Sequence, residues 1–187
     1  MTAERSWRRN IKSGVDYSCS VAAYVNGRIV GVTYVGLDDW KGEPAAFDSG
    51  TGIIPDYRGR GVAKGMFEYA LPELRNRGVA RFLLEVLKPN IAAIKAYSKT
   101  GFKTTRELAC YLLSPGEIRT AKRTSDDFEI HVIDKSAIQA FEALVDWQPS
   151  WENSFSGMDR IEDSLIRLGA FHQQRLVGIL VYYPLLQ

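Results

Sequence analysis

The sequence predicts a mixed α/β fold built on a mostly antiparallel sheet flanked by helices. Three observations support this prediction: hairpin-like pairs of β-rich runs near both ends of the chain, an amphipathic helical segment after the glycines at 59 and 61, and an apolar strand-like run at 79–87. Up to residue 113 the predicted order is β-β-β-α-β-α-β-β. The chain has 187 residues, 45% hydrophobic and 25% charged, which suits one domain or one and a half.

Local patterns place the elements of the first part of the chain. Asn26-Gly27, the strongest short signal for a hairpin, separates two runs rich in small and β-branched residues. Gly50 and Gly52 in the third run indicate a bulge or a backbone that a ligand approaches closely. We expect strands at residues 20–25, 28–35, 45–54 and 79–87, two more within 102–113, a polar loop at 38–44, and helices at 61–77 and 90–100.

The segment 61–77 is predicted to be a helix because apolar residues recur along one of its faces. Pro72 is expected to kink this helix or to mark a local adjustment, since proline cannot donate a hydrogen bond to the preceding turn. Gly78 is expected to end it. The apolar stripe consists of Val62, Met66, Phe67, Ala70, Leu71 and Leu74.

The second part of the chain is predicted to begin another copy of the same fold. The run Ala23-Tyr24-x-x-x-Arg28-Ile29-Val30-Gly31-Val32 aligns with Ala170-Phe171-x-x-x-Arg175-Leu176-Val177-Gly178-Ile179, at an offset of 147 residues. On this alignment the first copy would lack its opening strand and much of a helix, and the chain would be a fragment of a longer tandem protein. The expected boundaries are a first core at 1–118, a linker at 119–127 and a partial second copy at 128–187, with a strand at 128–133, helices at 137–146 and 159–168, and a hairpin at 170–183.

The loop at residues 58–64 points most directly to a ligand. It follows a strand-like run and Pro55, and it opens into the predicted helix. Glycines let a backbone approach an anion closely, and a helix N-terminus directs free N–H groups toward it. Arg58, Arg60 and Lys64 add positive charge. The predicted site is a cradle for a pyrophosphate, but not a dinucleotide fingerprint, because Lys64 stands where that motif requires its third glycine.

Two spaced patterns lie between Arg58 and Phe102. Arg58, Gly61 and Ala63 form R-x-x-G-x-A. This pattern is similar to Q/R-x-x-G-x-G/A, the acetyl-CoA signature of the GNAT superfamily of N-acetyltransferases. The second pattern, N-x-x-A-x-x-x-Y-x-x-x-G-F, follows at the family's distance. It is carried by Asn90, Ala93, Tyr97, Gly101 and Phe102. The resemblance covers about residues 20 to 113.

This resemblance implies transfer of an acetyl group from acetyl-CoA, as co-substrate, to a primary amine of a small molecule or peptide. In the family a splayed strand presents its backbone to the pantetheine and the thioester, and Asn90 and Tyr97 would contact the cofactor. Tyr97 would also protonate the departing thiolate. The implied cofactor-binding residues are Gly52, Ile53, Ile54, Arg58, Gly59, Arg60, Gly61, Val62, Ala63, Lys64, Asn90 and Tyr97.

The base that deprotonates the amine has more than one candidate. Glu85 stands in the apolar run 79–87, and a carboxylate with apolar neighbours holds a proton more readily. The ribosomal-protein alanine acetyltransferases place a glutamate five residues before the same asparagine. Asp48 is a second candidate, and some family members use an ordered water instead.

Composition and charge limit the classes of binding partner that the sequence suggests. A net charge of +2 favours neither nucleic acid nor a membrane surface, and no apolar run approaches the roughly 20 residues of a membrane span. Cys19 and Cys110 lack metal-ligand spacing, so no metal is expected, and we expect two buried free thiols in a cytoplasmic protein.

Two other functions stay open at this point. The chain could be a non-catalytic module that binds acyl-CoA and has a regulatory role. Alternatively, residues 128–187 could be a pairing element whose exposed sheet edge completes another chain, as in a homodimer, or fills the gap in the first copy. No residue pattern points to a particular amine acceptor.

Overall fold

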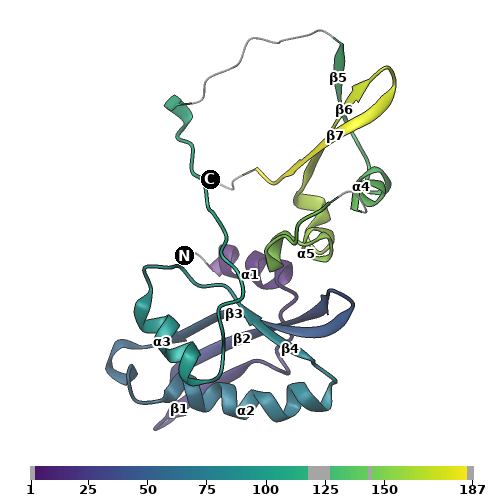
Figure 1. The fold of residues 1–187 in the computed structure, drawn as a ribbon. Coiled ribbons are helices and arrows are strands. Elements are labelled where there is room, and N and C mark those ends of the chain that lie inside the picture. Colours follow the sequence, from purple (N-terminus) through teal and green to yellow (C-terminus); the bar gives the residue numbers. More distant parts are fainter. Residues whose placement is uncertain (1–2, 118–126, 143–144, 185–187) are drawn as a thin grey trace. The chain divides into compact units, whose positions relative to one another are not determined.

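The computed structural model describes residues 3–117, 127–142 and 145–184 (Figure 1). The chain divides into two compact units, residues 1–106, here called unit 1, and residues 107–187, called unit 2. The predicted linker at 119–127 lies outside the described residues except for Asp127.

Unit 1 is a four-stranded sheet with helices on both faces (Figure 1). Its strands are β1 (Val21–Val25), β2 (Arg28–Trp40), β3 (Glu43–Ile53) and β4 (Arg81–Leu84), in that order across the sheet. The first three are antiparallel, and β4 is parallel to β3. The helices are α1 (Ala3–Lys12), α2 (Val62–Asn76) and α3 (Ile91–Lys99). The predicted fold class, a mixed α/β sheet flanked by helices, is confirmed.

Helix α2 covers one face of this sheet with the stripe that the sequence predicts. Its buried residues are Met66, Phe67, Ala70 and Leu74. Ala70 and Leu74 form a core cluster with Val35 and Ala46 of the sheet. The helix continues through Pro72 to Asn76, and Gly78, with φ 74°, follows its end as expected.

The predicted polar loop at 38–44 is wrong. Strand β2 runs on to Trp40 and β3 begins at Glu43, and Lys41 and Gly42 form a tight turn with φ of 58° and 78°. Positive φ at both central positions suits the twist of a two-residue hairpin. Aspartate is depleted in strands, so Asp38 and Asp39 favoured the prediction of a loop over that of a hairpin.

Helix α1 was not predicted from the sequence, and two strands predicted within residues 102–113 do not form. Helix α1 is joined to β2 by Val15, which forms a bridge to Gly36. A Cβ atom at Gly36 would collide with the carbonyl oxygen of Ser13, so only glycine fits this approach. Residues 102–113 form no strand, and Leu112 is 95% exposed there.

Unit 2 is a three-stranded antiparallel sheet with short helices. Its elements are β5 (Phe128–Val132), α4 (Lys135–Glu142), α5 (Phe155–Asp159), β6 (Ile166–His172) and β7 (Arg175–Tyr182), and the sheet order is β5-β6-β7. The helix predicted at 159–168 is wrong, because α5 ends at Asp159 and β6 begins at Ile166. Residues 143–144 of the helix predicted at 137–146 lie outside the described residues.

The hairpin β6–β7 repeats the hairpin β1–β2 in conformation as well as in sequence. Both central turn residues have positive φ in each, 50° and 75° at Asn26 and Gly27, 48° and 63° at Gln173 and Gln174. The register shift after Ala23 in β1 recurs after Ala170 in β6, at the same offset of 147 residues. The sheet and hairpin of unit 2 are thus consistent with the half-copy that the repeated sequence predicts, although the helix predicted at 159–168 is not part of it.

Two further observations concern membrane-spanning helices and the cysteines. No helix in the part of the chain that the structure describes is long and apolar enough to cross a membrane. Cys19 is a buried free thiol, as expected, whereas Cys110 is exposed, because the strand predicted around it does not form.

Candidate active site

The candidate site begins where β3 and β4 part. Their parallel pairing runs from Ala45 with Arg81 to Asp48 with Leu84 and ends there. Strand β3 continues to Ile53, paired with β2 on its other side. Among the described residues, no strand therefore pairs with the second edge of β3 from residue 49 to 53, and its backbone groups can serve a ligand.

The loop after β3 leads directly into the N-terminus of α2. Gly59 and Gly61 have φ of 71° and 81°, which lets the chain turn sharply into the helix. Within the described part of the chain, no side chain caps α2, and the N–H groups of residues 62–64 donate to no backbone oxygen outside the helix. An added Cβ at Gly61 would meet nothing within 4 Å. This helix end is therefore open to an anion.

Each basic side chain of the loop has its own contact. Arg58 donates from Nε to the carbonyl oxygen of Ile53 at 3.0 Å, which ties the loop to the end of β3. The Arg60 guanidinium lies 5.3 Å from the ring centre of Tyr57, and Lys64 pairs with Glu68 at 2.9 Å. Arg60 and Lys64 are exposed, so an anion at the helix end can compete for both.

A buried carboxylate marks the point where the strands part. Asp48 is 4% exposed and accepts hydrogen bonds from Thr33 Oγ1 (3.3 Å), the Gly50 N–H (3.0 Å), Thr51 Oγ1 (2.9 and 3.0 Å) and the Tyr97 hydroxyl (3.1 Å). Asp48 is thus linked directly to the tyrosine of the second sequence pattern. Thr33 and Thr51 were not predicted as site residues. Their only signal in the sequence is a polar side chain at a β-sheet position.

Burial shifts the proton equilibria of this pair. Desolvation raises the pKa of Asp48, although its hydrogen bonds from Thr51 and Tyr97 oppose the shift. The pKa of Tyr97 is raised above its usual value by burial first and then by the charge of Asp48. The charge of Asp48 therefore favours the protonated form of Tyr97, whereas the hydrogen bond from Tyr97 favours the ionised form of Asp48.

Aromatic packing fixes the position of Tyr97. Its ring lies edge-on to Phe67 at 5.9 Å and to Phe102 at 5.8 Å between centres. Phe67 and Phe102 also contact Phe82 of β4. Phe102 in the second sequence pattern thus holds the tyrosine against the sheet.

The other predicted residues lie around this centre. Asn90 caps α3 by accepting the Ala93 N–H at 3.2 Å. Glu85 was expected inside an apolar strand, but β4 ends at Leu84 and Glu85 is exposed. The prediction that Glu85 is buried is therefore wrong. The residue follows the end of β4 directly, where β3 and β4 part. Within the described ranges, no three His, Cys, Asp or Glu side chains come together as a metal site.

Unit 1 thus combines an open strand edge, a helix N-terminus suited to an anion, and a buried carboxylate–phenol pair. The family model described as the acetyltransferase (GNAT) family matches residues 2–102, more than half of the chain. The chain belongs to this family.

Solved structures similar to the chain include aminoglycoside acetyltransferases. AAC(6')-Iy in complex with a bisubstrate analogue of CoA is 24% identical, with a TM-score of 0.46, over 51% of this chain and 68% of that one. AAC(6')-IG from Acinetobacter haemolyticus is 17% identical, with a TM-score of 0.44, over 51% and 69%. A transcriptional regulator from Bacillus halodurans C-125 is 23% identical, with a TM-score of 0.46, over 50% and 65%. No curated protein matched the sequence.

Proposed function

We propose that unit 1 binds acetyl-CoA along the open edge of β3 and transfers the acetyl group to a primary amine. One observation carries this proposal: the open edge leads from the Asp48–Tyr97 pair directly to the uncapped N-terminus of α2. A ligand with an anion at one end and a reactive group at the other would match both ends of that edge. The catalytic core would be residues 1–118, with residues 119–127 as linker and 128–187 as partial second copy.

The pyrophosphate would bind at the start of α2. The N–H groups of residues 62–64 would donate to it, with Gly59 and Gly61 shaping the turn. Arg60 and Lys64 would leave Tyr57 and Glu68 to pair with the phosphates, whereas Arg58 would hold the loop in place. Gly52, Ile53 and Ile54 would contact the pantetheine through their backbone, and Asn90 through its side-chain amide.

Tyr97 would protonate the leaving thiolate. The amine attacks the thioester carbonyl, and the C–S bond breaks as the tetrahedral intermediate collapses. Beside an ionised Asp48 a tyrosinate is disfavoured, since the charge of Asp48 raises the pKa of Tyr97. If Asp48 is protonated, its proton passes to the Tyr97 oxygen as Tyr97 donates to sulfur. No tyrosinate accumulates in that relay.

Glu85 would act as the base, directly or through a water. Phe82 lies on the α2 side of β4, where it contacts Phe67. Leu84 shares that side by strand alternation, so the next residue would point to the opposite side. Glu85 is exposed there, where an amine can reach it. Asp48 is 4% exposed and held by four donor groups, so it is less accessible to an acceptor.

Release of CoA thiol from acetyl-CoA in the presence of a panel of primary amines tests the proposal, with product mass as the second readout. Tyr97→Phe should lower kcat by roughly 10²- to 10⁴-fold and keep acetyl-CoA binding. Tyr69→Phe is the matched control, since Tyr69 is 78% exposed on α2. Binding of acetyl-CoA without thiol release for any amine would instead support the non-catalytic module.

A further inference from the structure

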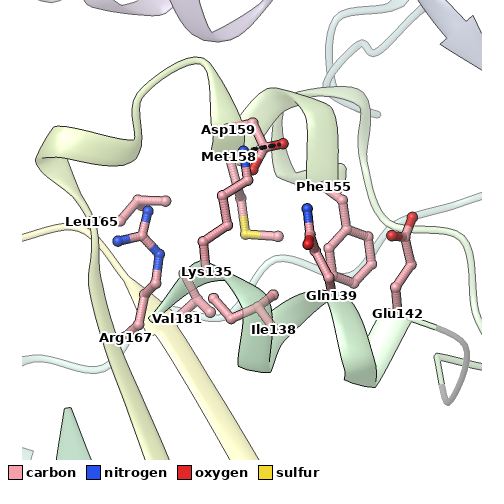
Figure 2. A pocket seen from close by; sticks show the side chains of 10 residues that line it. All are labelled: Lys135, Ile138, Gln139, Glu142, Phe155, Met158, Asp159, Leu165, Arg167 and Val181. Carbon is pink, nitrogen blue, oxygen red and sulfur yellow. Dashed lines mark ion pairs between the residues drawn. The ribbon is translucent and has the colours of Figure 1, made fainter. Parts of the chain in front are cut away.

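The described residues of unit 2 cover one face of its sheet and leave the other face open. Figure 2 shows the covered side, where Ile138 of α4 and Phe155 and Met158 of α5 lie over Arg167 and Val181 of the strands. Lys135 joins the two helices through an ion pair with Asp159 at 2.9 Å. The helices leave only a small cavity of about 40 Å³ against this face.

The opposite face carries apolar side chains in neighbouring register positions. Val132, Leu168 and Leu180 are paired across the three strands, and Ile166 pairs with Tyr182. Leu180 is 57% exposed and Val132 is 78% exposed. We call this surface the open face. It consists of Phe128, Ile130, Val132, Leu168, Leu180 and Tyr182.

Unit 1 shows what covers the equivalent face. At the offset of 147 residues, Leu180 corresponds to Thr33 and Tyr182 to Val35. Thr33 is 1% and Val35 0% exposed, and Val35 packs against Ala70 of α2. In unit 2 the corresponding exposed fractions are 57% and 41%.

The equivalent glycines show the same difference. A Cβ at Gly31 would meet Val62 of α2 at 3.2 Å and Ile53 at 2.7 Å. A Cβ at Gly178 would meet only Ala170, its neighbour on β6, at 3.8 Å. The strands, the turn and the bulge are therefore repeated, whereas the covering helix is not repeated among the described residues of unit 2.

We propose that the open face of unit 2 is a docking site for an amphipathic helix of the kind that α2 provides in unit 1. The occupant would present bulky apolar residues at the spacing of the α2 stripe, in which Met66, Phe67, Ala70 and Leu74 are buried. Helix on sheet is the packing that this chain already uses on the same strand pattern, which favours a helix over the sheet of a second copy.

A peptide with the sequence of residues 61–78 tests the proposal against the full chain. Fluorescence anisotropy of the labelled peptide should show saturable binding. Leu180→Glu should weaken binding roughly tenfold or more, because the complex would bury an unpaired carboxylate. Leu112→Glu, the same change at a residue 95% exposed outside the sheet, should bind like wild type. A peptide with Glu in place of Phe67 and Leu74 should not bind.

The proposal is overturned if the peptide does not bind, or binds wild type and Leu180→Glu equally. A second possible outcome is that the wild-type chain dimerises, that Leu180→Glu does not dimerise, and that the peptide does not bind. A second copy would then be the occupant, which also overturns the proposal. Val132→Glu is the second variant in case Leu180→Glu misfolds, since Val132 lies on the neighbouring strand and is 78% exposed.

Discussion

Asp48→Asn tests the link between Asp48 and Tyr97 while keeping the shape of the side chain. Oδ1 of Asp48 accepts from Thr33, Gly50 and Thr51, and Oδ2 accepts from Tyr97 and Thr51. An asparagine with its oxygen in the Oδ1 position keeps the first three contacts. Its NH2 group then faces the hydroxyls of Tyr97 and Thr51. Thr51 keeps only its contact with the Oδ1 position, and the Tyr97 hydroxyl must turn and accept. The substitution therefore reverses one hydrogen bond and removes one proton carrier.

The magnitudes follow from that geometry. Losing the hydrogen bond from Tyr97 to a charged oxygen costs about 1.5 to 3 kcal/mol, and removing a buried charge offsets much of this cost. We expect the free energy of unfolding to change by less than about 2 kcal/mol at neutral pH. If Asp48 is protonated when acetyl-CoA is bound and passes its proton to Tyr97, loss of this relay should lower kcat roughly 10²- to 10⁴-fold, equivalent to about 3 to 5 kcal/mol in the barrier.

The pH dependence of stability has a definite sign. Burial raises the pKa of Asp48, so the folded chain binds this proton more tightly than the unfolded chain does. Its stabilising contribution is complete below the unfolded pKa of 3.8 and is lost as pH rises through the folded pKa. Asparagine has no such contribution. The stability of Asp48→Asn relative to wild type should therefore increase with pH.

Urea unfolding at several pH values, together with the pH profile of kcat, measures both effects. Asp163→Asn is the control, because Asp163 is exposed in unit 2. Unchanged kcat in Asp48→Asn would refute the relay. A stability difference that falls as pH rises would refute the buried, proton-binding carboxylate.

Other predictions concern local packing and cofactor contacts. Gly36→Ala should lower the free energy of unfolding by roughly 2 to 4 kcal/mol in urea titration, because its Cβ would collide with the Ser13 carbonyl; a loss below about 0.5 kcal/mol would contradict this close approach. Asn90→Ala should cost about 1 kcal/mol of stability and Asn90→Ser almost none, whereas both should weaken acetyl-CoA binding if the amide contacts the pantetheine. Arg58→Lys keeps the charge but loses the guanidinium that donates to the Ile53 carbonyl, so it should weaken acetyl-CoA binding. Unchanged affinity would exclude this positioning role of Arg58.

Features with a local signal could be predicted from the sequence. The stripe of α2, the glycine turn before it and the two-residue turn at Asn26-Gly27 all depend on neighbours within a few positions. Features that depend on tertiary pairing could not be predicted in this way. Asp38 and Asp39 lie in a strand because β3 pairs with them, and residues 102–113 have strand-like composition but no strand partner in the described part of the chain.

The residues of the candidate site also fall into those with a local signal and those whose contacts depend on tertiary pairing. Tyr97 and the loop at 58–64 could be located by motif spacing. The hydrogen bonds that Thr33 and Thr51 make to Asp48 depend on the register between β2 and β3, which includes a shift after Tyr34. A register that contains a bulge cannot be inferred from alternation alone.

We have proposed that the N-terminus of α2 binds the pyrophosphate of acetyl-CoA. Isothermal titration with acetyl-CoA should compare wild type, Gly61→Glu and Gly78→Glu. The two glycines flank α2, have φ of 81° and 74°, and each has open space around an added Cβ. Both variants therefore carry the same strain and the same added charge, about 25 Å apart along the helix.

A carboxylate about 4 Å from a phosphate costs about 1 to 4 kcal/mol. We predict that wild type and Gly78→Glu bind acetyl-CoA with similar affinity and that Gly61→Glu binds at least about tenfold more weakly. Equal weakening in both variants, or none in Gly61→Glu, would contradict an anion site at the start of α2.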